Sequence, residues 1–162
     1  MVRKWALLLV LLFITGKSQA TEIELSVNLA KQTGEYHNPY VAAWIENESG
    51  KSVRTLLLWR EGAKWLKDLR TWWRKVGRRN KELVDGITSA TRPAGDYRLS
   101  FKALDDNDKP LAEGEYTLKV EVVRENGGRA IIKQKFKLNG ESQSYQLKAT
   151  PETNKATFSI KE

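Results

Sequence analysis

The stretch GEYTLKVEVVRENGGRAIIKQKFKL, residues 114–138, decides the fold of this chain. Its two halves, 114–125 and 129–138, have the composition of extended β-segments. Between them stands Asn-Gly-Gly at 126–128, a combination of residues that tight turns favour. We therefore expect two β-strands here, joined by a turn.

Shorter segments of the same kind lie on both sides of this stretch. The first alternates apolar with polar positions, the pattern of a strand with one buried face, at Ile23, Leu25, Val27 and Leu29. The others are bounded by turn residues and cover 39–47, 52–60, 96–104, 144–150 and 155–161. About seven to nine short strands at this spacing predict a mainly β protein, with the architecture of an immunoglobulin-like β-sandwich.

After the segment at 52–60 the hydrophobic period changes. In GAKWLKDLRTWWRKVGRR, residues 62–79, apolar residues recur at spacings of three and four, which predicts one inserted, amphipathic, Trp-rich helix. Its apolar positions are Trp65, Leu66, Leu69, Trp72, Trp73 and Val76. Gly77 is a natural stop, and the helix dipole favours the cations near that end, which are Arg74, Lys75, Arg78 and Arg79.

Two interpretations of this helix are open, and they are compatible. In the first, its apolar residues cover the open face of the sandwich. In the second, Trp72 or Trp73 forms, with the four cations, an aromatic and cationic surface for a phosphate-bearing planar ligand or a membrane face. Both can hold because Trp72 and Trp73 point to different sides of a helix.

The N-terminus has the three parts of a secretory signal peptide: a basic start, an uncharged apolar run over 5–14, and small residues up to Ala20. The apolar run is too short to span a bilayer as a helix, so we expect cleavage after Ala20. Residues 1–20 are then a cleaved signal peptide, and residues 21–162 form a single β-sandwich domain in the periplasm.

Composition limits the functions that this domain can have. The chain has no cysteine, so it has neither disulfides nor thiolate chemistry. Cleavage would remove three of the 28 basic residues and leave 25 against 20 acidic ones, a net charge of +5. In an exported protein such a charge argues against nucleic acid, and it favours anionic lipid, a cell-wall polymer or a phosphate-bearing cofactor.

Hydrolytic and metal-dependent catalysis have little support in the sequence. The single histidine, His37 in EYHNPY, is expected to be a loop residue with local hydrogen bonds. A hydrolase would need His37 within hydrogen-bond reach of a Ser or Thr and a carboxylate. The acidic run at 105–116 lacks the Gly and Glu positions of a calcium-binding EF-hand, so we expect an acidic β-turn before a strand at Tyr116.

Five stretches, taken in order, resemble one family of bacterial proteins. They are HNPYVAAWIEN, VRTLLLW, the Trp-spaced helix, DGITSATRPAGDY and EGEYTLKVEVVRE. The family consists of predicted periplasmic proteins called domain of unknown function 2271, and the resemblance extends over residues 22–137. The later part of the family is similar to the immunoglobulin-like domain of flagellar hook-capping proteins. Phe101 stands here where that similarity would expect a Trp, and it keeps an aromatic residue in the core.

One of these stretches, DGITSAT at 85–91, also resembles the acceptor sequence of covalently flavinylated proteins, such as the flavin subunits of sodium-pumping NADH:quinone reductase and Rnf complexes. In that pattern an Asp is followed, after two residues, by Ser or Thr, then Gly, Ala and the hydroxyl residue that takes FMN. The resemblance implies that Thr91 is the acceptor, preceded by Asp85, Thr88, Ser89 and Ala90. Ser89 replaces the Gly, which matters if the position needs a positive φ angle.

The chemistry of FMN attachment suits these residue types. An FAD:protein FMN transferase, assisted by Mg²⁺, needs an unhindered hydroxyl nucleophile flanked by small residues, and Thr91 follows Ser89 and Ala90. We expect the attached phosphate to lie beside Arg92, and the flavin ring to stack on an exposed aromatic residue such as Trp73.

The leading functional hypothesis is a periplasmic electron carrier with FMN on Thr91, which exchanges electrons with a membrane redox protein. The chain has no nucleotide-binding fingerprint for NAD, so electrons would arrive from another protein. An alternative is that the hydroxyl residues of 85–91 only satisfy backbone groups in a loop. The protein would then be a cofactor-free binding or accessory module that docks on a membrane protein or an anionic envelope component through its basic, Trp-rich surface.

Overall fold

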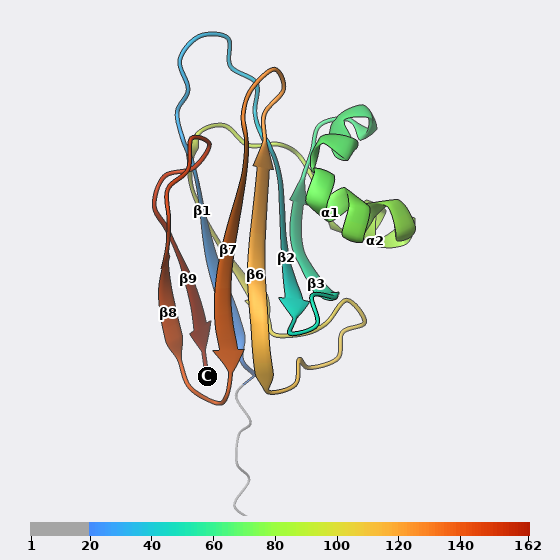
Figure 1. The fold of residues 1–162 in the computed structure, drawn as a ribbon, viewed down its shortest axis with the longest axis vertical. Helices are drawn as coiled ribbons and strands as arrows, with labels where there is room; N and C mark the ends of the chain where they lie inside the picture. The colour runs from blue at the N-terminus through green and yellow to red at the C-terminus, as the bar shows by residue number, and fades with distance from the viewer. Residues whose placement is uncertain (1–19) are drawn as a thin grey trace, which may run out of the picture.

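The computed structural model describes residues 20–162 and contains two β-sheets packed face to face (Figure 1). The predicted signal peptide lies outside the described residues, apart from Ala20. The first sheet has the order β5-β1-β9-β8, formed by Gly95–Lys102, Glu22–Leu29, Ala156–Lys161 and Gln143–Leu147. The second sheet has the order β4-β3-β2-β6-β7, formed by Thr88–Ser89, Ser52–Trp59, Tyr40–Asn47, Gly114–Val123 and Arg129–Leu138.

The stretch 114–138 forms the predicted pair of strands. β6 and β7 pair in antiparallel fashion from Gly114 opposite Leu138 to Val123 opposite Arg129. Every other expected strand forms as well, and only the two-residue β4 lies where the sequence predicted a loop. The prediction of a mainly β sandwich is therefore confirmed.

The main core lies between the sheets, where alternate side chains of both meet. Ile23, Leu25 and Val27 of β1 are buried, which is the face that their alternation predicted. They belong to one cluster with Leu118 of β6 and Phe158 of β9. Because strands bury every second side chain between the sheets, the remaining side chains of the second sheet need another cover.

That cover is a helical layer, which we define as residues 63–87 and which lies beside β2 and β3 in Figure 1. It contains 3₁₀ turns at Ala63–Asp68 and Gly77–Arg79, helix α1 at Arg70–Lys75 and helix α2 at Lys81–Ile87. A second apolar cluster joins the layer to the sheet through Leu66, Leu69, Trp72, Val76 and Val84 on one side and Tyr40, Ala42, Trp44 and Leu58 on the other. The interpretation that this stretch covers the open face of the sandwich is confirmed.

The prediction of one continuous helix over this stretch is wrong. The backbone leaves helical geometry at Leu69 and Val76, and α2, which the spacing analysis missed, follows Asn80. A 3₁₀ helix also brings residues three apart to the same side, so a broken path satisfies the same apolar spacing. A start signal for α2 was present, because the Asn80 side chain caps it by accepting a hydrogen bond from Leu83 N at 3.0 Å.

Gly77, the first residue of the second 3₁₀ turn, lies shortly after α1 in a place where no side chain fits. A Cβ added there would lie 2.6 Å from the Trp73 ring and 2.7 Å from the Trp72 ring. Any side chain at this position would therefore force one or both of the indole rings to move. Among residues 20–162, none of the helices has the length and hydropathy needed to cross a membrane.

Candidate functional site

The predicted acceptor lies where the chain crosses from one sheet to the other. We call residues 85–92 the acceptor segment. After α2, the two residues of β4 pair in parallel with the end of β3, with Thr88 opposite Leu58 and Ser89 opposite Trp59. The chain then passes from β4 in the second sheet to β5 in the first. Thr91 lies in this crossover, next to exposed Ser89 and Ala90.

Arg60, which directly follows β3, contacts the first part of the acceptor segment. Arg60 Nε donates to Thr88 Oγ1 at 3.1 Å, and its guanidinium lies 4.0 Å from Asp85 Oδ1. The backbone N–H of Arg60 donates to the Ser89 carbonyl at 2.9 Å. Two positions of the acceptor pattern, Asp85 and Thr88, thus converge on one side chain.

The two threonines of the segment are in different states. Thr88 Oγ1 accepts from Arg60 and donates to the Val84 carbonyl at 2.5 Å, so its hydroxyl is used in both directions. Thr91 is half-buried, and its hydroxyl forms no hydrogen bond with any described residue. Among the described residues, the polar side-chain atoms that are buried without a hydrogen-bond partner are Tyr36 Oη, Ser52 Oγ and Arg54 Nε. Thr91 Oγ1 is not one of them. The Thr91 hydroxyl therefore reaches solvent.

Arg92 packs on two aromatic rings beside Thr91. Its guanidinium carbon lies 4.5 Å from the centre of the Trp59 ring and 5.1 Å from that of Tyr97. These rings meet edge to face at 5.3 Å, and Tyr97 Oη donates to the Pro93 carbonyl at 2.8 Å. A guanidinium stacked in this way keeps its in-plane N–H donors free, and in the described part of the chain Arg92 has no carboxylate partner.

The structure brings together the site residues that were predicted from sequence, except Trp73. Asp85, Thr88, Ser89, Ala90, Thr91 and Arg92 form one continuous segment on the edge of the sandwich. Trp73 packs instead in the apolar cluster of the helical layer. Local sequence patterns could not indicate Arg60, Trp59 and Tyr97, because their proximity to the acceptor segment arises from the pairing of β3 with β4 and from the crossover to β5.

The helical layer presents cations to solvent. We call its exposed Lys and Arg residues the basic face: Lys64, Lys67, Arg70, Arg74, Arg78, Arg79 and Lys81. Lys75 is not part of it, because Lys75 Nζ lies 2.8 Å from Glu46 Oε1 and donates to the Gly50 carbonyl. Trp72 is fully buried, so it cannot supply the aromatic surface that we considered for it, whereas Trp65 and Trp73 are half-buried.

Two buried carboxylates fix α1 to the sheet beneath it. Glu121 accepts backbone N–H groups of Thr71 and Trp72 at 3.1 and 2.9 Å, and its other partner is Arg129 at 2.7 Å. It thereby caps the start of α1, where Leu69 has no side-chain acceptor. Glu46 pairs with Lys75 at the other end of the helix, so α1 is attached to the sheet at both ends.

The charge of Glu46 is stabilised by its neighbours. Burial alone raises the pKa of this carboxyl, but hydrogen bonds from Lys119, Lys75 and Trp44 outweigh burial and leave the pKa below its usual value of 4.5. Lys119 Nζ lies 2.7 Å from Glu46 Oε2, and Trp44 Nε1 donates to Oε1 at 2.9 Å. Glu46 is therefore ionised at neutral pH.

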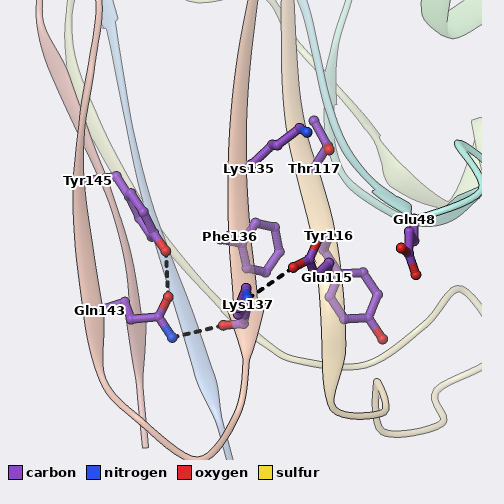
Figure 2. Close-up of a pocket in the computed structure, with 9 residues that line it drawn as sticks. All are labelled: Glu48, Glu115, Tyr116, Thr117, Lys135, Phe136, Lys137, Gln143 and Tyr145. Carbon is purple, nitrogen blue, oxygen red and sulfur yellow. Dashed lines mark hydrogen bonds and ion pairs between the residues drawn. The ribbon is translucent and has the colours of Figure 1, made fainter.

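A hollow of about 320 Å³ lies beside β6, β7 and β8, and its lining contains no residue of the acceptor segment. Figure 2 shows the residues that line it. Several of its polar groups pair with one another. Lys137 lies 3.0 Å from Glu115, Gln143 donates to the Lys137 carbonyl at 2.9 Å, and Tyr145 Oη donates to Gln143. The Phe136 ring at its centre belongs to the main core. We assign no chemistry to this hollow.

His37 lies in the loop before β2, between two carboxylates. Its ring nitrogens are 3.4 Å from Glu35 and 4.0 Å from Glu125, and the described residues bring no Ser or Thr hydroxyl into hydrogen bonding with it. The arrangement lacks the nucleophile that the hydrolase alternative requires. Within residues 20–162, no three His, Asp or Glu side chains gather closely enough to hold a metal ion.

Comparison with known proteins identifies a family. No curated protein matches this chain, and no solved structure does. The model of one family, DUF2271, described as a predicted periplasmic protein, matches residues 20–155. The resemblance noted in the sequence is thereby confirmed over nearly all of the described residues, and the chain belongs to the DUF2271 family of predicted periplasmic proteins.

Proposed function

We propose that this periplasmic protein is an electron carrier that holds FMN covalently on Thr91. The observation that supports the proposal most is the difference between the two threonines of the acceptor segment. The Thr88 hydroxyl forms hydrogen bonds with Arg60 and with the Val84 carbonyl, whereas the Thr91 hydroxyl bonds to none of the described residues. Group transfer requires a hydroxyl nucleophile that is not already engaged in hydrogen bonds within the fold, as at Thr91.

The proposed attachment is a transfer from FAD by a secreted FMN transferase. Thr91 Oγ1 attacks the phosphorus on the riboflavin side of the diphosphate, and a new phosphoester bond forms. The bond from that phosphorus to the bridging oxygen breaks, and AMP leaves with that oxygen. The hydroxyl proton passes to a base of the transferase, where Mg²⁺ assists the leaving phosphate. Exposed Ser89 and Ala90 give the segment little bulk with which to obstruct the transferase.

The residues around Thr91 suit an FMN group. The free donors of Arg92 could pair with the phosphate, and Arg60 adds a second guanidinium to the same segment. Half-buried Tyr97 is an aromatic neighbour for the flavin ring, while stacking on Trp73 stays a prediction. Bound FMN would supply reversible one- and two-electron chemistry, which no side chain of this cysteine-free protein supplies.

The test is the intact mass and visible absorption of protein exported together with an active FMN transferase. We expect a yellow protein that is heavier by one FMN, and we expect Thr91→Val to be colourless and unmodified. Ser89→Ala, which removes a neighbouring exposed hydroxyl, is the matched control and should still be modified. An unmodified wild type, with the transferase active on another acceptor, would refute the proposal.

A further inference from the structure

We infer that the basic face binds an anionic phospholipid surface. This goes beyond the proposed function and does not rest on it, because the basic face has the same charge with or without FMN. The inference rests on the distribution of charge over the fold, on the pairing of the carboxylates beneath the helical layer, and on two half-buried tryptophans among the cations.

The net positive charge of the exported chain is located in the helical layer. Residues 63–87 contain eight basic and three acidic residues, a net charge of +5. The other residues after Ala20 contain 17 of each sign, so they contribute no net charge. The whole excess therefore lies on one side of the sandwich, over the outer face of the second sheet. A field of this kind attracts a surface of opposite charge and orients the molecule toward it.

In the part of the chain that the structure describes, the cations of the basic face have no carboxylate partners. The two buried carboxylates that contact α1 from the sheet, Glu46 and Glu121, are paired with Lys75, Lys119 and Arg129. In residues 20–162, no cation of the basic face forms an ion pair. The buried carboxylates are thus neutralised by cations beneath the layer. The cations of the basic face stay available to bind an external anion.

The aromatic residues of the layer favour lipid over an acidic protein. Trp65 and Trp73 are half-buried in the same layer as the cations, and Lys64 Nζ lies 4.5 Å over the Trp65 ring. Tryptophan together with Lys and Arg is the composition of surfaces that lie in the headgroup region of a membrane. Each cation near such a surface contributes about 1 kcal/mol, so several together give measurable binding.

Docking through this face would also bring the acceptor segment close to the membrane. Helix α2 begins at Lys81 of the basic face and ends at Ile87, directly before Thr88. Seven residues of α-helix span about 10 Å. The acceptor segment therefore lies within reach of a redox partner in the same membrane.

The test is vesicle sedimentation with protein purified from the periplasm of cells without an FMN transferase. Vesicles of phosphatidylcholine alone are compared with vesicles that also contain phosphatidylglycerol. We expect binding only to the anionic vesicles, weakening steeply as salt is raised. Because this protein carries no FMN, failure of the flavin proposal cannot change the result.

Two triple variants with the same charge locate the binding. Arg74, Arg78 and Arg79 are replaced by Gln in the first, and the exposed lysines Lys102, Lys148 and Lys155 in the second. The loss of three charges from the basic face should weaken binding roughly 100-fold. The second variant should bind much more tightly than the first. Equal weakening by the two variants, or no binding of the wild type to anionic vesicles at low salt, would overturn the inference and leave an acidic protein as the partner.

Discussion

The helical layer and the acceptor segment share residues 85–87, but they are held in different ways. The layer is fixed by a buried apolar cluster and by two buried carboxylates that arrive from β2 and β6. The acceptor segment is held by Arg60, by the two-residue strand β4 and by the packing of Arg92 on two rings, and the Thr91 hydroxyl bonds to none of the described residues. Beside a well-packed layer, a partly exposed segment that contributes few buried contacts is one in which modification would cost the fold little.

The largest effect that we expect comes from the carboxylate under the start of α1. Glu121→Gln keeps the size of the side chain but removes the charge that pairs with Arg129 and accepts the N–H groups of Thr71 and Trp72. Breaking a buried pair from one side should lower the free energy of unfolding by about 3 kcal/mol. Urea denaturation of wild type and Glu121→Gln at neutral pH measures this difference in the free energy of unfolding.

Glu115 on the same strand is the control for this prediction. It pairs with Lys137 at 3.0 Å, but both side chains are exposed. We expect Glu115→Gln to unfold at the same urea concentration as the wild type, within error. If the two variants behaved alike, Glu121 would not be what secures the layer.

A smaller effect, which depends on pH, is expected from the carboxylate at the other end of α1. The pKa of Glu46 is lowered in the folded protein, so its contribution to stability is present above about pH 4.5 and is lost as the pH falls through the lower folded value. Wild type should be more stable than Glu46→Gln at neutral pH, and the gap should narrow below pH 4.5. Urea titrations at several pH values would show this.

Asp106 gives the opposite trend and serves as the comparison. Burial raises its pKa above the usual 3.8, and the hydrogen bond from Thr55 N offsets only part of this rise. Its charge therefore weakens the folded state at neutral pH, and the penalty disappears as the pH falls through the raised value. Relative to Asp106→Asn, wild type should gain stability on acidification. If the stability difference between wild type and variant changed with pH in the same direction for Glu46→Gln and for Asp106→Asn, the account would be contradicted.

The smallest effect distinguishes the two threonines of the acceptor segment. Thr88→Val removes a hydroxyl bonded to Arg60 and Val84 and should lower the free energy of unfolding by about 1 kcal/mol. Thr91→Val removes a hydroxyl with no bond to the described residues, so its thermal unfolding should match that of the unmodified wild type. Equal losses for both variants would mean that Thr91 has a structural role.

The strands and the covering face could be predicted because local patterns determine them. Alternation at Ile23, Leu25 and Val27 and the turn at 126–128 report which side chains are buried and where the chain reverses. Spacing also indicated that Leu69 and Val76 face the sheet. It could not distinguish an α-helix from a 3₁₀ turn, because both place residues three apart on one side.

The surroundings of the acceptor could not be predicted in the same way. Arg60 lies 28 residues from Thr88 in sequence, and their hydrogen bond exists because β4 pairs with the end of β3. The burial of Glu121 was equally hidden, since a glutamate in a strand is ordinarily exposed, and its partners at Thr71 and Trp72 come from another element. Such contacts follow from tertiary packing, which no local period records.

The central claim is that Thr91 carries the flavin, and the most direct test is to find the modified residue. Trypsin should release residues 82–98 as one peptide, because Arg92 is followed by Pro93, and this peptide contains all three candidate hydroxyls. Fragmentation of the peptide from protein exported with an active transferase should place one FMN on Thr91. An unmodified peptide, or FMN on Thr88 or Ser89, would contradict the account.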